Sequence, residues 1–137
     1  MSDTILIIGA CGQIGSELAQ KLREINGGDN VIASDIREGN EELLNSGPFE
    51  ILDATDRDGI LRVVQKYNIT QVYLMAAMLS ATGEKFPAKA WELNMNSLFN
   101  VLNLAKDGKK CKLVCITCVV KHRDNSETLV NNYFIYW

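Results

Sequence analysis

Two kinds of apolar pattern alternate along the chain. Short continuous runs rich in Ile, Val and Leu are bounded by glycine or polar residues, which is typical of strands buried on both faces of a sheet. Between them, apolar residues recur every three or four positions, the period of an amphipathic helix. The expected strands are residues 4–8, 31–35, 49–52, 71–75 and 112–117. This alternation predicts an α/β fold with a doubly wound parallel sheet of about five strands.

Capping residues and glycines place the ends of the helices and loops. The expected helices cover residues 13–26, a stretch that begins after Asp56, and a long stretch from Pro87 to near Asp107. The expected loops are residues 37–48, with one helical turn around residues 42–44, and residues 76–86. Asp56 suits a helix N-cap, and Pro87 suits a first helical turn.

The apolar positions of the first and last helices predict which faces are buried. The inner face of the first helix is expected to hold Ile14, Leu18, Leu22 and Ile25. The last helix carries a stripe with spacings of 4, 3, 4 and 3 residues, formed by Trp91, Met95, Leu98, Leu102 and Ala105. We expect both rows to pack against the sheet.

Gly9, Gly12 and Gly15 have G-x-x-G-x-x-G spacing and join the first strand to the first helix. Such a turn lets the backbone approach a pyrophosphate, and the helix N-terminus offers free N–H groups and partial positive charge. The context is that of a Rossmann-type dinucleotide-binding unit, in which the last glycine allows close packing of helix on sheet. The alternative is that the glycines serve a tight turn alone.

Asp35 ends the second strand, 20 residues after Gly15. A carboxylate there can accept hydrogen bonds from the adenosine ribose hydroxyls of NAD and would repel the extra phosphate of NADP. Arg37 stands two residues on and would partly offset this repulsion. We therefore expect a preference for NAD; the alternative is that Asp35 only caps the end of the strand.

The composition fits one domain of a globular protein. The chain of 137 residues has a net charge of −3 and a pI near 5.1, which argue against nucleic-acid binding and against a polybasic membrane patch. Its longest apolar runs, residues 5–8 and 72–79, are too short to cross a bilayer. The acidic N-terminus differs from a signal peptide, and four cysteines do not make a disulfide framework. These features predict a cytoplasmic protein.

Four segments carry a resemblance to a known family. They are residues 8–15 (IGACGQIG), 30–37 (NVIASDIR), 76–81 (AAMLSA) and 94–101 (NMNSLFNV). Together they resemble the extended short-chain dehydrogenase/reductase group, the NAD-dependent epimerase/dehydratase family, and within it the L-threonine 3-dehydrogenases. The resemblance runs from about Thr4 to Gly108. It implies NAD as the cofactor and a small-molecule substrate, L-threonine.

The resemblance also implies roles for the matching positions. Residues that would contact the pyrophosphate are Gly9, Gly12, Gln13 and Ile14, and those that would contact the adenosine ribose are Asp35, Ile36 and Arg37. The remaining cofactor contacts would be Asp53 and Ala54 at the adenine edge, Ala76 and Ala77 beside the nicotinamide ribose, and Asn94 supporting the active site. Ser80 would face the bound amino acid. Ser80 as a plain loop hydroxyl and Asp53 as a turn cap are the alternatives.

The catalytic half of the family's active site has no match in this sequence. The family uses a Ser or Thr after the fifth strand and a Tyr-x-x-x-Lys, in which the lysine lowers the pKa of the tyrosine that removes the hydroxyl proton. No Tyr-x-x-x-Lys occurs here, and Thr117 is interpreted as a remnant of the Ser/Thr position. Residues 1–117 are expected to form the NAD-binding domain and residues 118–137 an unassigned tail, so that the sheet is incomplete, truncated after its fifth strand with an open edge.

Two other features have competing interpretations. Cys111, Cys115, Cys118 and His122 are zinc-compatible ligands, but Cys115 and Cys118 would project to opposite faces of a strand, so we expect no metal site. In the family's dimers the long helix pairs with the tyrosine helix, so its apolar stripe is either core packing or partly a face between two copies. Core packing is the favoured alternative.

The sequence thus predicts the NAD-binding portion of an L-threonine 3-dehydrogenase-like oxidoreductase. The complete enzyme would oxidise L-threonine to 2-amino-3-ketobutyrate with NAD, and this chain would be inactive alone. The alternatives are an NAD-dependent sugar-nucleotide epimerase or dehydratase, and a non-catalytic NAD-binding or sensor module.

Overall fold

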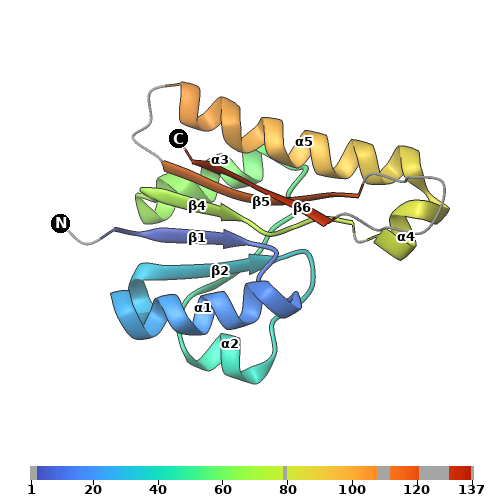
Figure 1. The fold of residues 1–137 in the computed structure, drawn as a ribbon. Coiled ribbons are helices and arrows are strands. Elements are labelled where there is room, and N and C mark those ends of the chain that lie inside the picture. Colours follow the sequence, from blue (N-terminus) through green and yellow to red (C-terminus); the bar gives the residue numbers. More distant parts are fainter. Residues whose placement is uncertain (1–2, 79, 108–111, 121–129, 137) are drawn as a thin grey trace.

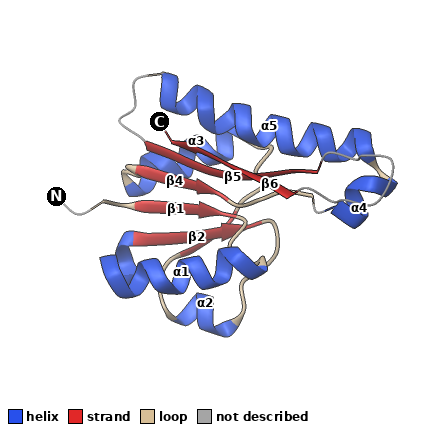
Figure 2. Cartoon of the chain, in the orientation of Figure 1, coloured by secondary structure: helices blue, strands red, loops and turns tan. Residues whose placement is uncertain are grey.

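The computed structural model describes residues 3–78, 80–107, 112–120 and 130–136, and of residues 80–81, 112–120 and 130–136 it describes the backbone only. Within these residues, one sheet lies between two layers of helices (Figures 1 and 2). The described strands are β1 (Ile5–Ile8), β2 (Val31–Asp35), β3 (Phe49–Ile51), β4 (Gln71–Leu74), β5 (Lys112–Val120) and β6 (Val130–Tyr136). The helices are α1 (Gln13–Asn26), η1 (Gly28–Asn30), α2 (Glu41–Asn45), α3 (Arg57–Tyr67), α4 (Ser80–Lys85) and α5 (Pro87–Lys106).

The strand order is β3-β2-β1-β4-β5-β6. The first five strands in this order run parallel, and β6 runs antiparallel to β5. The chain therefore winds outward from β1 to β3 and then crosses back to place β4 on the other side of β1. The predicted α/β class with a doubly wound parallel sheet is confirmed. Ligands of such sheets bind where the winding reverses, beyond the carboxyl ends of the strands.

Strand β1 shows why both faces of the sheet are covered. Ile5 and Ile7 are buried in a cluster with apolar residues of α1 and α2, while Leu6 and Ile8 are buried in a second cluster with residues of α3 and α5. Successive side chains of a strand point to opposite faces, so an unbroken apolar run needs helices on each side. Figure 1 shows α1 and α2 on one face and α3 and α5 on the other.

Three elements lie where the sequence predicted no helix or strand, namely η1, α4 and β6. Helix α4 falls within the expected loop of residues 76–86. The sequence pattern did not predict it because a helix of six residues is too short to show an apolar period. Strand β5 continues past residue 117 to Val120, and β6 lies in the expected unassigned tail. The pairing of Val120 with Val130 explains the longer strand, since an antiparallel partner extends the ladder. The edge of β5 that we expected to be open is covered by β6.

The buried face of α1 differs from the predicted one. Ile14 and Ile25 are 62% and 68% exposed, whereas Gly15, Ala19 and Arg23 are buried. Small residues let the helix approach the sheet closely. With Gly15 and Ala19 facing the sheet, the row of larger residues lies to the side of the contact. Leu18 and Leu22, also expected on the inner face, are partly buried against the cluster on this side of the sheet.

The buried face of α5 also differs from the predicted stripe. Ser97, Val101 and Leu104 are buried, and Leu98 and Leu102 of the stripe pack beside them. Trp91 is 69% exposed, so the prediction that it packs against the sheet is wrong. Core packing thus accounts for the C-terminal part of the stripe. A face between two copies of the chain stays a prediction.

The side chain of Arg23, on α1, is hydrogen-bonded to β2, to α2 and to the segment between α2 and β3. Its guanidinium donates hydrogen bonds to the carbonyl oxygens of Val31 (3.2 Å), Leu43 (2.8 Å) and Pro48 (2.7 Å), and to the Ser46 hydroxyl (2.7 Å). The residue is 5% exposed, and in the described part of the chain no carboxylate pairs with it. Burial lowers the pKa of the guanidinium, which is stabilised by these acceptors. The helical pattern of α1 gave no indication of this role.

Arg23→Lys should lower the free energy of unfolding by about 3 kcal/mol, because one ammonium group cannot reach all the acceptors that surround the planar guanidinium. Urea denaturation followed by circular dichroism measures the loss. The control is Lys21→Gln on the same helix, where the loss of an exposed ion pair with Glu24 should lower the free energy of unfolding far less. Equal losses for the two variants would contradict the role assigned to Arg23.

Candidate functional site: a cleft at the carboxyl ends of the strands

A cleft of about 470 Å³ opens beyond the carboxyl ends of the strands, where the winding of the sheet reverses. We call it the cofactor cleft. It is lined by Gly9, Gly12, Gln13, Ile14, Gly15, Asp35, Ile36, Arg37, Asp53, Ala54, Met75, Ala76, Ala77 and Leu93. The structure therefore brings together all the cofactor residues proposed from the sequence except Asn94, which follows Leu93 on α5.

Met75 and Leu93 line the cleft but were not expected there. Met75 directly follows β4, and its backbone N–H donates to the Ile8 carbonyl oxygen at 2.7 Å. The rule that ligands bind beyond strand ends could have included it. Leu93 comes from α5, and the pattern of that helix does not show which residue reaches the cleft.

The glycine turn is bonded to β2 and lies close against the segment that follows β4. The N–H groups of Gly9 and Ala10 both donate to the Ser34 carbonyl oxygen, at 2.8 and 2.9 Å. Gly9 has φ +95°, and a Cβ there would lie 2.5 Å from the Ala76 nitrogen. A Cβ at Gly15 would collide with the Gly9 carbonyl oxygen. The fold itself therefore requires glycine at both positions.

Gly12 differs from the other two glycines of the motif. Its φ is −74°, and a Cβ there would meet only the Gly9 carbonyl oxygen, at an ordinary contact distance of 3.5 Å. It is the N-cap of α1 and has no side chain to accept a hydrogen bond from the first helical turn. Because Gly12 has no side chain, N–H groups of the first turn of α1 have no side-chain cap where they face the cleft. An anion binds at a helix N-terminus by accepting from such N–H groups.

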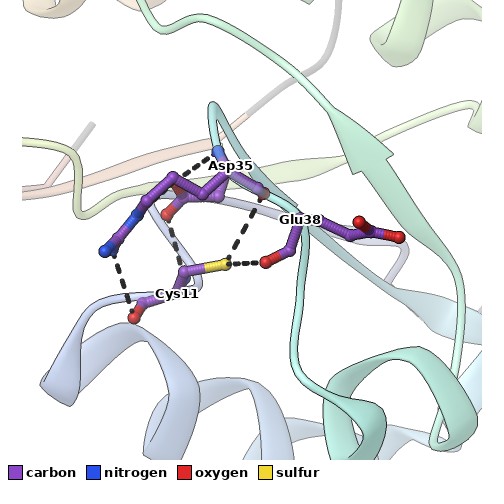
Figure 3. Close-up of polar contacts among 4 residues, drawn as sticks. Cys11, Asp35 and Glu38 are labelled. Carbon is purple, nitrogen blue, oxygen red and sulfur yellow. Dashed lines mark hydrogen bonds and ion pairs between the residues drawn. The ribbon is translucent and has the colours of Figure 1, made fainter.

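The Asp35 carboxylate holds the glycine turn against the end of β2 (Figure 3). Its Oδ2 accepts a hydrogen bond from the Cys11 backbone N–H at 2.9 Å, and its Oδ1 accepts one from the Arg37 backbone N–H at 3.1 Å. Nε of the Arg37 guanidinium lies 3.6 Å from Oδ1, and Nη2 donates to the Cys11 carbonyl oxygen at 3.4 Å. Asp35 is 7% exposed, so these contacts keep a buried charge paired.

Cys11 faces the segment after β2, with its Sγ 3.8 Å from the Arg37 carbonyl oxygen and 3.7 Å from that of Glu38 (Figure 3). Burial and the negative charge of Asp35 raise the pKa of the thiol, and the charge of Arg37 opposes this only in part. A thiol with a raised pKa stays protonated at neutral pH and is a poor nucleophile. Cys11 therefore contributes weak hydrogen bonds that join two loops.

The turn after β3 and the segment after β4 form the other walls of the cleft. Asp53 Oδ1 accepts hydrogen bonds from the Thr55 backbone N–H (2.8 Å) and hydroxyl (2.7 Å). On the opposite side, Asn94 Oδ1 accepts a hydrogen bond from the Met78 backbone N–H at 3.0 Å. Asn94 thus supports the segment that contains Ala76 and Ala77 without lining the cleft.

The proposed substrate and catalytic residues are described only in part. Ser80 begins α4, and Thr117 lies in β5 opposite Tyr133, but the side chains of Ser80 and Thr117 lie outside what the structure describes. The zinc candidates Cys111 and His122 lie outside the described residues, as do the side chains of Cys115 and Cys118.

Among the residues that are described, no three His, Cys, Asp or Glu side chains gather as they would around a metal ion. In the same part of the chain, no helix is long and apolar enough to cross a membrane.

A smaller hollow of about 300 Å³ is lined by residues of β3, of α3 and of the turn between them, including Asp53, which also lines the cofactor cleft. Lys66 Nζ lies 2.6 Å from Glu50 Oε1, and Arg62 lies 3.7 Å from Asp56. Hydrogen bonds from Lys66 and Tyr67 hold the pKa of Glu50 below its usual value. Because its charged groups pair with one another, this hollow is a weaker candidate site than the cofactor cleft.

Comparisons with known proteins place the chain among relatives that are longer. It is 50% identical over 105 residues to an uncharacterised epimerase/dehydratase of Staphylococcus haemolyticus, a match that covers 76% of this chain and 33% of the relative. The chain thus spans about a third of the length of that relative.

Similar solved structures are also of chains longer than this one. A partial consensus L-threonine 3-dehydrogenase is 56% identical, with a TM-score of 0.76 over 80% of this chain and 35% of that one. L-threonine dehydrogenase from Clostridium difficile is 39% identical, with a TM-score of 0.80 over 97% of this chain and 44% of that one. A UDP-glucose 4-epimerase from Stenotrophomonas maltophila, 22% identical with a TM-score of 0.71 over 82% of this chain and 36% of that one, shares the fold alone.

The pattern of the NAD dependent epimerase/dehydratase family matches residues 5–126, which is most of the chain. This match includes the glycine turn, Asp35 and every other residue that lines the cofactor cleft. The chain therefore belongs to the NAD dependent epimerase/dehydratase family.

Proposed function

We propose that this chain binds NAD in the cofactor cleft, as the nucleotide-binding portion of an L-threonine 3-dehydrogenase-like oxidoreductase. One observation carries the proposal: Gly12 leaves the N-terminus of α1 without a side-chain cap at the cleft, and the Asp35 carboxylate lies at the end of the neighbouring strand. A dinucleotide needs both features, an anion site for its pyrophosphate and acceptors for its ribose hydroxyls.

The pyrophosphate would lie against the first turn of α1. The backbone N–H groups there carry partial positive charge, and Gln13 and Ile14 line the adjoining wall. A Cβ at Gly12 would occupy space beside these N–H groups although the packing of the protein leaves room for it. The ligand, rather than the fold, thus accounts for glycine at this position.

The adenosine ribose would lie against Asp35. Each carboxylate oxygen accepts one backbone hydrogen bond, Oδ1 also lies 3.6 Å from Arg37 Nε, and an ionised oxygen can accept a second hydrogen bond. The two remaining acceptor positions suit the two ribose hydroxyls. A 2′-phosphate would meet the same negative charge, and Arg37 is engaged with Asp35 and the Cys11 carbonyl oxygen. The arrangement favours NAD over NADP.

The remaining contacts follow the walls of the cleft from one end to the other. Asp53 and Ala54 would meet the adenine edge, and Ala76 and Ala77 would lie beside the nicotinamide ribose. Ser80 would face the amino acid substrate. We propose the cytoplasm as the location, in keeping with the acidic net charge.

In the complete enzyme, NAD would accept a hydride from the secondary alcohol of L-threonine, giving 2-amino-3-ketobutyrate. The proton of that alcohol would need a base, and this sequence has no Tyr-x-x-x-Lys to supply one. We therefore propose that the chain by itself binds NAD without turnover. Threonine-dependent formation of NADH by the purified chain would contradict this part of the proposal.

Gly12→Ala should weaken NAD binding at least about tenfold and change the free energy of unfolding by less than about 1 kcal/mol, because the added methyl group meets the ligand and not the protein. Gly9→Ala should instead destabilise the fold by about 3 kcal/mol or more, since its Cβ would meet backbone atoms at a positive φ. Calorimetric titration and chemical denaturation measure the two effects. Unchanged NAD affinity in Gly12→Ala would contradict the proposed pyrophosphate site.

The wild-type chain should bind NAD at least about tenfold more tightly than NADP, because the Asp35 carboxylate repels a 2′-phosphate. Asp35→Asn should bring the two affinities close together, since it removes the charge and keeps an oxygen that can accept the Cys11 N–H. Titration of both dinucleotides against both proteins checks this. Equal affinities in the wild type would show that Asp35 does not select the cofactor.

A further inference from the structure

Asn100 on α5 contacts the turn that follows β3. Its Nδ2 donates hydrogen bonds to the Ala54 carbonyl oxygen at 3.2 Å and to the Thr55 carbonyl oxygen at 3.0 Å. The contact joins segments about 45 residues apart in the chain. None of the interpretations of the apolar stripe on α5 gave this residue a role.

Packing of α5 does not require an amide at this position. The helix buries its face through Ser97, Val101 and Leu104, and Asn100 lies beside this face, partly buried. The bond to the Ala54 carbonyl oxygen is part-buried and the bond to the Thr55 carbonyl oxygen is exposed, so their contribution is to restrain the geometry of the turn. Asn100 supplies two such hydrogen bonds from one side chain.

The turn bonded by Asn100 also contains Asp53. The Asp53 Oδ1 accepts hydrogen bonds from the N–H and the hydroxyl of Thr55, and the Asp56 N–H donates to the Asp53 carbonyl oxygen at 3.0 Å. Asp53 lines the cofactor cleft, and its Oδ2 accepts no hydrogen bond from the residues that are described. The two bonds from Thr55 hold Oδ1 and so restrain the Asp53 carboxylate, which is exposed and lines both the cofactor cleft and the smaller hollow. Asn100 in turn bonds the Thr55 carbonyl oxygen.

We propose that Asn100 is a positioning residue for purine selectivity: by holding the carbonyl oxygens of Ala54 and Thr55, it aims the Asp53 carboxylate at the exocyclic amino group of the adenine. This inference rests on the proposed binding of NAD in the cofactor cleft. A 6-amino group donates to a carboxylate, whereas the 6-oxo group of hypoxanthine is repelled by it. Selectivity between the two purines thus depends on an asparagine that does not line the cleft.

The test compares NAD with nicotinamide hypoxanthine dinucleotide, which differs from it in the purine alone. The wild-type chain should bind NAD about tenfold more tightly, the difference made by one hydrogen bond to a charged acceptor. In Asn100→Leu, which has a similar size and no donor, this ratio should fall below about threefold, mainly through weaker binding of NAD. If that variant does not fold, Asn100→Asp carries the same expectation, since it replaces the donor by an acceptor.

Asn103→Leu is the matched control, because Asn103 is exposed on the same helix, and it should keep the wild-type ratio. An equal loss of affinity for both dinucleotides in Asn100→Leu would indicate a structural role only and would overturn the inference. So would a wild-type ratio near one, or an unchanged ratio in the variant. Failure of the wild type to bind either dinucleotide would instead contradict the proposed function.

Discussion

The attachment of the glycine turn to the end of β2 is the constraint on which the cofactor cleft depends. The Ser34 carbonyl oxygen accepts the N–H groups of Gly9 and Ala10, and the Asp35 carboxylate accepts the N–H of Cys11. The Ser34 hydroxyl, fully buried, donates to the Ile7 carbonyl oxygen at 2.8 Å. With these bonds made, the N-terminus of α1 and the carboxylate of Asp35 face the same space. The residue that we propose for ribose binding thus also builds the phosphate site.

The other walls of the cleft are held in the same way, by single polar side chains that bond to loop backbone. Asn94 holds the segment after β4 through the Met78 N–H, and Asn100 holds the turn after β3. Both asparagines come from α5, so the spacing between the two loops is set by a rigid helix. A site held before the ligand arrives loses less conformational entropy when it binds. We therefore assign selectivity between dinucleotides to Asn100, which does not line the cleft, as well as to Asp35, which does.

The sequence predicted most of the fold because its signals are local. Unbroken apolar runs mark buried parallel strands, and Asp56 caps α3 through a 3.0 Å hydrogen bond from the Gly59 N–H. The glycine spacing and Asp35 could be found for the same reason. Arg23, Leu93 and Asn100 could not, because their partners lie far away in the chain and only the packed structure brings them together. The exposure of Ile14 has a similar origin, since two small residues on α1 decide how the helix lies on the sheet.

We propose that a single cleft, built around the glycine turn and Asp35, binds NAD. Titration of the ¹⁵N-labelled chain with NAD, followed by nuclear magnetic resonance, tests it most directly, because each backbone N–H reports its own surroundings. We expect saturable shifts at the amides of Gly12, Gln13 and Asp35, together with Ala76 at the far wall. The absence of shifts, or shifts confined to the hollow beside Arg62 and Lys66, would contradict it.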